Sequence, residues 1–376
     1  LVQFYRGFVL FRAYRATPIL FSNRKSNVFA QSLCEGVTLM GYADGVISAA
    51  TAPLFMAIGF VMWEKHWTSS ALLLNIFKCT FASTIFLVVS ILDRSFFSVS
   101  NALFSFEKVG YLILSSLLGI IVGDNMWLQA LKLLGTRRTM LVDSIKPFVG
   151  ALLSALILKE EVSLMLFLGM FFTASGVLLV GLERSEEMHT NSGEEGLEGR
   201  VPDVSIENVV VNTGAVSSLT VYVGYMCAFF NVLLDVGGTI ITKQFGQTYS
   251  TFEINYIRFG FAGYSMGLFV GMNRAVSTLI LKSQPRSSFV WPMLGRREWV
   301  LISVGAFFVT FLCPALFFYS IFEIDLAVAM TLSSLGPIYS IPITCWFKGE
   351  QVTVQSIVGS LFAFVGVIPL YFSLGG

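Results

Sequence analysis

The sequence predicts an all-α polytopic membrane protein with ten transmembrane helices in two inverted five-helix repeats. Three observations carry this prediction. Charged residues make up 12% of the 376 residues, about half the roughly 25% of a soluble domain. The apolar residues gather into runs close to the ~20 residues that a helix needs to cross hydrocarbon. The second half of the chain also repeats residues of the first half at a constant spacing.

Apolar runs separated by charged or turn-forming residues define the expected helices. These runs lie near residues 42–63, 70–92, 109–131, 138–158, 163–182, 219–242, 253–272, 299–322, 327–347 and 353–374. The stretch 183–218 is rich in Glu, Gly and Ser, as a solvated linker is. We therefore divide the chain into a first repeat at 40–182, an acidic linker at 183–218 and a second repeat at 219–376.

The N-terminal segment 1–39 is basic and aromatic, with no acidic residue before Glu35. Two interpretations of this segment stay open. Its composition loosely resembles that of a transit peptide. Alternatively, translation begins at Met40, the first methionine, and the segment lies upstream of the start.

Cysteine, histidine and net charge exclude several function classes. The five cysteines are scattered without a C-x-x-C pair, so we expect buried thiols. His66 and His189 stand alone, so neither a His-centred triad nor an H-E-x-x-H metal site can be built. The 24 Lys and Arg residues nearly balance the 23 Asp and Glu residues, which argues against nucleic acid as a partner.

An internal repeat aligns residues 110–180 with residues 300–370 at an offset of 190, without a gap. The pairs with the strongest structural reasons are Pro147 with Pro337, Glu160 with Glu350, Gly169 with Gly359, and Gly176 with Gly366. Further upstream, with two residues of gap, Gly59 lies near Gly238 and Lys78 near Arg258. A duplicated unit of five spans must enter the membrane in opposite senses in its two copies. This favours a carrier with a site between the halves over an enzyme.

Two stretches resemble a known family. Trp127 to Leu131 read W-L-Q-A-L, and Pro147 precedes a Lys159-Glu160 break, with a weaker copy at 333–350 that ends in Gly349-Glu350. In these motifs the chain resembles the EamA family of the drug/metabolite transporter superfamily. The family has Gly where Lys159 stands and often Arg where Lys78 stands. The resemblance covers about 320 residues.

The resemblance implies a ten-helix secondary transporter that binds no cofactor. The family transports amino acids, drugs, nucleotide sugars and sugar phosphates, so membership does not fix the substrate.

Ionisable side chains inside predicted spans are costly, at roughly 2.5 to 3.5 kcal/mol each on the insertion scale, unless they are paired or wetted. The candidate site residues are Lys78, Asp124, Trp127, Asp143, Lys146, Asn231, Asp235 and Arg258. Asp143 and Lys146 are three residues apart, so they either neutralise each other or leave Lys146 for a substrate. Asn231 and Asp235 share a helix face that is a candidate cavity lining.

Asp124 has two interpretations. It either pairs with Lys78 or Lys132, or it is the proton-coupling carboxylate, because burial disfavours its charge. Lys78 and Arg258 are either contacts for an anionic substrate or cations that snorkel to the interface. Because neither has a well-placed local partner, we expect both to lack a compensating carboxylate.

Two structural roles are expected outside the site. The glycines at 169, 176, 359 and 366 are spaced by seven within each half, so they should form smooth stripes for close helix packing. Glu160 and Glu350 should cap or tether short connections.

The sequence therefore predicts a secondary transporter that moves a small metabolite with an anionic group by alternating access, coupled to H⁺ or to exchange. It would lie in the lipid bilayer of a plasma membrane, an endomembrane or a plastid envelope, and a homodimer stays open. The alternatives are a membrane receptor or structural protein without transport, and an intramembrane aspartyl protease. The protease is disfavoured because Asp124 lacks the first Gly of G-x-G-D.

Overall fold

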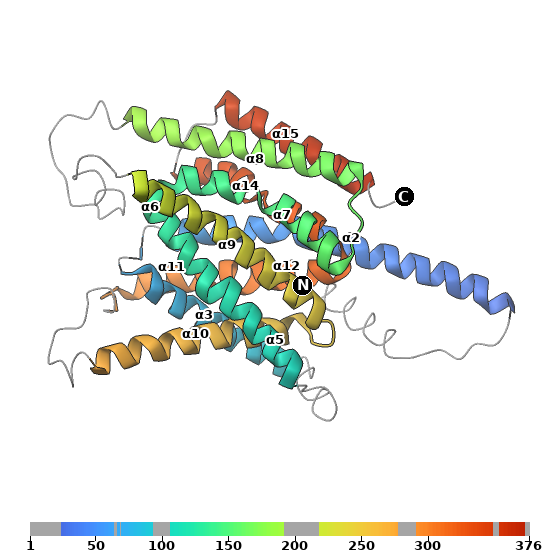
Figure 1. Cartoon of the computed structure of the whole chain (residues 1–376), viewed down its shortest axis with the longest axis horizontal. Helices are drawn as coiled ribbons and strands as arrows, with labels where there is room; N and C mark the ends of the chain where they lie inside the picture. The colour runs from blue at the N-terminus through green and yellow to red at the C-terminus, as the bar shows by residue number, and fades with distance from the viewer. Residues whose placement is uncertain are drawn as a thin grey trace. The chain divides into compact units, whose positions relative to one another are not determined.

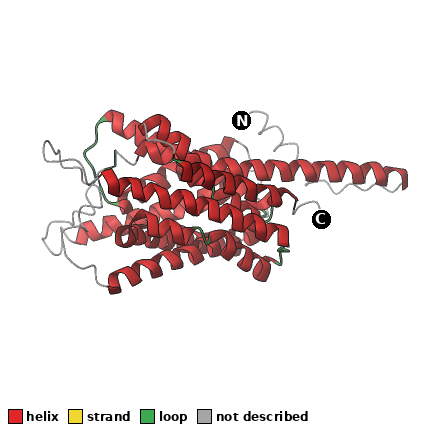
Figure 2. Cartoon of the chain, turned by 90° about the horizontal axis from the view of Figure 1, so that it is seen from above, coloured by secondary structure: helices red, strands yellow, loops and turns green. Residues whose placement is uncertain are grey.

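The described residues form helices joined by short turns and loops, as predicted, with no strand among them (Figure 2). The computed structural model describes residues 24–63, 66–67, 69–92, 106–191, 218–276, 291–348 and 353–372. The helices, with η for π-helical segments, are α2 (Arg24–Trp63), α3 (Ala71–Leu92), α5 (Phe106–Ser116), η1 (Leu117–Gly123), α6 (Asp124–Asp143), α7 (Lys146–Leu153), η2 (Ser154–Leu158), α8 (Leu164–Asn191), α9 (Ser218–Phe245), α10 (Thr251–Ala275), α11 (Arg296–Ala306), η6 (Phe307–Leu312), α12 (Cys313–Glu323), α13 (Leu326–Ser333), α14 (Gly336–Lys348) and α15 (Val354–Phe372).

Six helical stretches within the described residues are long and apolar enough to cross a membrane. They are Gly41–Met62, Leu72–Leu92, Phe106–Trp127, Val221–Phe245, Arg296–Glu323 and Leu326–Ile343. Three of the other predicted spans correspond to shorter apolar helices, at 146–158, 164–180 and 354–370. The fourth, near 253–272, falls within α10, which carries Glu253 and Arg258. The fold is thus that of a multi-span protein, and ten spans stay a prediction.

Residues 45–376 form one compact unit and residues 1–44 another. Helix α2 begins at Arg24, and the first 23 residues of the predicted tail lie outside the described part. At the other predicted boundary, α8 continues past residue 182 to Asn191, because Glu is a good helix former. The remainder of the predicted acidic linker, from residue 192 to 217, lies outside the described part.

The predicted interruption between residues 131 and 138 is wrong. Segments α5, η1 and α6 form one continuous helical run from residue 106 to 143. The chain breaks instead at residues 144–145. Pro147 lacks an N–H, and its ring would clash with the carbonyl group of Asp143, four residues earlier, if the helix continued.

The second half breaks at the matching places. Helix α13 ends at Ser333, four residues before Pro337, and a two-residue turn follows it. The π-helical segments η1 and η6 begin at Leu117 and Phe307, which are also 190 residues apart. The sequence offset is therefore matched by local backbone structure.

Helices α8 and α15 pack side by side through the predicted glycine stripes (Figure 1). A β-carbon on Gly169 would lie 2.8 Å from the carbonyl oxygen of Gly366, and one on Gly359 would lie 2.8 Å from the carbonyl oxygen of Gly176. The residue numbers of the paired glycines rise along α8 and fall along α15, so the two helices are antiparallel. The packing role of these glycines is confirmed.

A second pair of glycines makes equivalent contacts in the two halves. Gly59 of α2 packs against Gly305 and Val309, at the junction of α11 with η6. Gly238 of α9 packs against Ser115 and Gly119, at the junction of α5 with η1. Ser115 lies 190 positions before Gly305, and Gly119 lies 190 positions before Val309. The loose sequence match between Gly59 and Gly238 therefore corresponds to matching helix contacts.

Helices α3 and α10 pack against each other along a buried apolar core. Gly260 approaches Ser83, and Gly267 approaches Ile76. The numbering again runs in opposite directions, so this pair is antiparallel. The same two helices carry the matched cations Lys78 and Arg258.

The glycine stripe makes a stability prediction. A β-carbon on Gly176 would clash with the backbone of Gly359 and Ala363, whereas one on Gly271 of α10 would meet nothing within 4 Å. We expect Gly176→Ala to lower the unfolding free energy by about 1–3 kcal/mol through overpacking. Gly271→Ala, the matched control, should be neutral or slightly stabilising. Denaturant unfolding in detergent micelles checks this, and equal stability of the two variants would contradict the packing.

Candidate functional site

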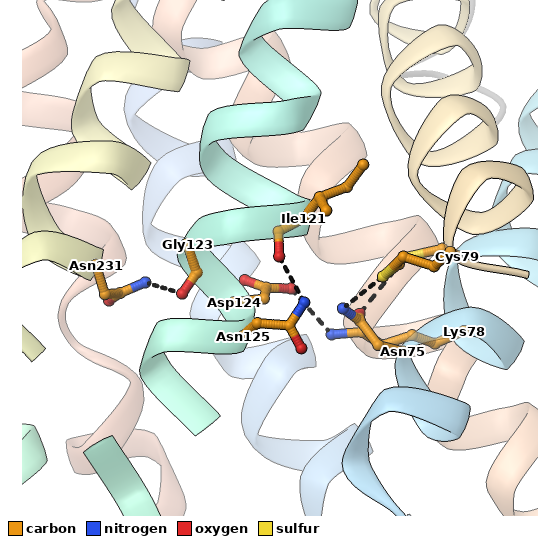
Figure 3. A network of polar contacts seen from close by, with 9 residues as sticks. Asn75, Lys78, Cys79, Ile121, Gly123, Asp124, Asn125 and Asn231 are labelled. Carbon is orange, nitrogen blue, oxygen red and sulfur yellow. Dashed lines mark hydrogen bonds and ion pairs between the residues drawn. The ribbon is translucent and has the colours of Figure 1, made fainter. Parts of the chain in front are cut away.

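Lys78 of α3 and Asp124, the first residue of α6, form an ion pair that joins two helices (Figure 3). Lys78 Nζ donates to Asp124 Oδ2 at 3.4 Å. Of the two possible partners of Asp124, Lys78 and Lys132, the structure shows Lys78. The expectation that Lys78 lacks a compensating carboxylate is wrong, because its partner lies 46 positions along the chain, beyond the reach of helix spacing.

The end of η1 brings backbone carbonyl groups to this ion pair. Asn125 Nδ2 donates to the carbonyl oxygen of Ile121 at 2.6 Å, and Asn231 Nδ2 of α9 donates to that of Gly123 at 3.0 Å (Figure 3). A π-helical turn disturbs the regular i→i−4 bonds and is common at functional sites. The two asparagines satisfy carbonyl groups of this segment and fix the position of Asp124.

Lys146, the first residue of α7, bridges two carboxylates. Its Nζ lies 3.4 Å from Asp143 Oδ1, as the three-residue spacing predicts, and 3.2 Å from Asp235 Oδ2 of α9. Trp127 Nε1 donates to the other oxygen of Asp143 at 2.8 Å. Lys146 therefore ties α7 to α9, and Trp127 orients the carboxylate that holds it.

Arg258 of α10 is buried, with only 3% of the residue exposed, so it does not snorkel to a surface. Its guanidinium carbon lies 4.3 Å from the ring centroid of Phe318 of α12, and its Nε makes no hydrogen bond within the described part of the chain. Its neighbour Glu253 is occupied in a capping box with Ser250. A buried guanidinium with a free N–H is a strong candidate for binding an anion.

Arg258 faces the other charges across Gly119 of η1. A β-carbon on Gly119 would lie 3.5 Å from Arg258 Nη2 and 4.0 Å from Asp235 Oδ1, so the missing side chain leaves the space between these groups free. Asp235 and Asp124 have the most exposed side chains of the ion pairs, at 41% and 39%. These two carboxylates lie at the open side of the site.

We call six ionisable residues the charged cluster: Lys78, Asp124, Asp143, Lys146, Asp235 and Arg258. Its formal charges, three positive and three negative, cancel. Among the described side chains, no group of three His, Cys, Asp or Glu residues is arranged to hold a metal ion. Besides Nε of Arg258, the buried Oδ1 of Asn231 makes no hydrogen bond within the described residues. Such atoms are places where water or a polar ligand can bind.

The structure brings together all eight predicted site residues. Their contacts form two neighbouring groups. Lys78 pairs with Asp124, and Asn231 bonds to the residue before Asp124. Trp127, Asp143, Lys146 and Asp235 form the other group, and Arg258 approaches it across Gly119. Sequence reasoning missed Phe318 as the support of Arg258, and it missed the carbonyl groups of η1. Nothing in the sequence pairs Phe318 with Arg258, whereas Asn125 beside Asp124 was a visible signal of a polar patch.

Comparison with known proteins identifies a family. The family model of the EamA-like transporter family matches residues 43–182 and 222–372. No curated protein matches the chain. A solved structure, described only as a crystal structure of a protein, is similar with a TM-score of 0.61 at 13% sequence identity, over 87% of this chain and 96% of that one. At this identity the likeness shows a common fold.

Proposed function

Because the chain belongs to the EamA-like transporter family, we propose that it is a secondary carrier that moves a small metabolite with an anionic group by alternating access. The chain is an integral, multi-pass membrane protein of a transporter family, not of an enzyme family. The substrate, the coupling and the ten-span inverted architecture are our proposals.

The packing of equivalent helices supports inverted repeats. Helix α8 matches α15 in the sequence repeat, and these two helices pack antiparallel. When the two halves are exchanged, the contact of Gly169 with Gly366 becomes the contact of Gly359 with Gly176. A contact that maps onto itself in this way is typical of a two-fold axis. We therefore propose that the shorter helices and α10 also span, which gives ten.

The charged cluster lies between the two halves, where an inverted-repeat carrier binds its substrate. Lys78, Asp124, Asp143 and Lys146 come from the first half, and Asp235 and Arg258 from the second. The ion pair of Lys146 with Asp235 crosses from one half to the other. A bound anion would compete with Asp235 for Lys146 and would weaken this ion pair. Because the pair joins the two halves, its loss would allow them to move relative to each other.

The observation that carries the anionic-substrate proposal is Arg258. A buried guanidinium without a hydrogen-bonded carboxylate is unfavourable unless a ligand or water completes it. The stacked Phe318 keeps the planar group in place. Because Asp124 and Asp235 lie at the open side, a substrate that also carries an amino group would find a carboxylate there.

One transport prediction concerns Arg258. We expect Arg258→Gln to raise the apparent KM for an anionic substrate about tenfold or more, since a lost charge-assisted hydrogen bond is worth roughly 1.5–3 kcal/mol. Arg258→Lys should recover part of the loss. Arg274→Gln removes an exposed arginine of the same helix and should leave KM unchanged. Uptake by proteoliposomes of a panel of organic acids, amino acids and phosphorylated metabolites measures this.

A normal KM in Arg258→Gln would remove Arg258 from the binding site. Transport of lipophilic cations only would end the anionic-substrate proposal.

Another transport prediction concerns coupling. We propose that Asp124 alternates between its ion pair with Lys78 and a protonated state. Asp124→Asn should then abolish uptake driven by an imposed pH gradient, while exchange of external for internal substrate persists. Glu107→Gln neutralises an exposed carboxylate of α5 and serves as the control. Unchanged proton-driven uptake in Asp124→Asn would show that Asp124 does not couple transport to protons.

A further inference from the structure

Another buried ion pair involves α9, on the helix face that also carries Asp235 of the charged cluster. Lys243 of α9 pairs with Glu160, which follows η2, and the two side chains are only 15% and 12% exposed. The expectation that Glu160 tethers a connection is confirmed, whereas its counterpart Glu350 lies outside the described residues. None of the substrate or coupling roles proposed above uses this pair.

The pair also holds both ends of a helix break. Glu160 Oε2 accepts the N–H of Leu326, the first residue of α13, at 2.9 Å. Lys243 Nζ donates to the carbonyl oxygen of Ile324, just after α12, at 2.9 Å. These are groups that a helix end leaves without an intrahelical partner. We call the two side chains, with the backbone groups of Ile324 and Leu326, the latch.

The face of α9 between the charged cluster and the latch is buried, and we call this buried face the closed path. Asp235, Thr239 and Lys243 follow each other at four-residue intervals and so share one helix face. Asp235 and Lys243 are about 12 Å apart along the axis, at 1.5 Å per residue. Thr239 between them is only 2% exposed. The exposed fraction of the side chain falls from 41% at Asp235 to 15% at Lys243.

Helix α5 packs closely against the same stretch of α9. Ser115 Oγ donates to the carbonyl oxygen of Gly238 at 2.8 Å and lies 2.6 Å from Thr242 Oγ1. Asp325, in the α12–α13 connection, adds a second carboxylate, whose pKa is raised by burial and by repulsion from Glu160. Lys243 is thus paired with Glu160 and also lowers the electrostatic repulsion at Asp325.

Helix α12 connects the latch to the substrate site. Phe318 packs under the guanidinium of Arg258, and the same helix ends next to Ile324, which Lys243 holds. A shift of α12 when Arg258 binds a substrate would therefore pull on the latch.

We infer that the latch is the closed gate of the carrier at this end: its ion pair must break, and the α12–α13 break must be uncapped, before the site opens here. This inference rests on the proposed carrier function. It assigns Lys243 and Glu160 to gating rather than to substrate binding.

The test measures access to the closed path without using transport. The full-length protein, with its five native cysteines replaced by serine and Thr239→Cys as reporter, is treated with a membrane-impermeant maleimide. Glu160→Gln keeps the size of the side chain and removes its charge. We expect it to raise the labelling rate of the reporter about tenfold or more, since a charge-assisted bond is lost. Glu161→Gln, at an adjacent exposed carboxylate, should leave the rate unchanged.

Equal labelling rates in Glu160→Gln and the parent would overturn the inference, and so would an equal rise in Glu161→Gln. If Glu160→Gln is not monodisperse, Lys243→Gln is measured in its place with the same expectation. Because labelling needs no substrate, the two proposals fail separately. Normal uptake with unchanged labelling would reject only the gate, and increased labelling without uptake of any substrate would reject only the carrier.

Discussion

Charge neutralisation inside an apolar helical bundle is the constraint on which this structure depends. Each ionisable group within a span costs about 2.5–3.5 kcal/mol if it is left unpaired. In the charged cluster, ion pairs between different helices neutralise most of these groups. Lys78 with Asp124 joins α3 to α6, and Lys146 with Asp235 joins α7 to α9. Among the described residues, Arg258 contacts the ring of Phe318 and forms no ion pair with a carboxylate. The neutralisation is therefore least complete where we place the substrate.

A helix break and a π-helical segment position the residues of the charged cluster. Pro147 ends the long helix before it and places Lys146 at the start of α7, within reach of α9. The π-helical segment η1 presents carbonyl groups to Asn125 and Asn231 and leaves space at Gly119. The glycine stripes of α8 and α15 allow close backbone contact away from the cluster. The two halves thus meet through close backbone packing at α8 and α15 and through polar contacts at the charged cluster. This arrangement is compatible with movement of one half against the other.

Local signals in the sequence predicted much of the fold. Hydropathy indicated the membrane class, and the seven-residue spacing of the glycines indicated the packing stripes, because each of these signals lies within a single helix. The pairing of Asp143 with Lys146 followed from helix spacing. The bridge from Lys146 to Asp235, the partner of Lys78 and the ring under Arg258 join distant segments. Helix periodicity carries no information about such contacts.

In the carrier that we propose, the charged cluster binds substrate and faces one side of the membrane at a time. Counterflow tests it most directly: proteoliposomes loaded with an excess of an unlabelled substrate from the uptake panel are diluted into the labelled compound. A carrier should accumulate label transiently above its external concentration, because returning sites exchange internal for external substrate. The account predicts this overshoot. Equilibration without overshoot, or no counterflow for any anionic or zwitterionic compound, would contradict it.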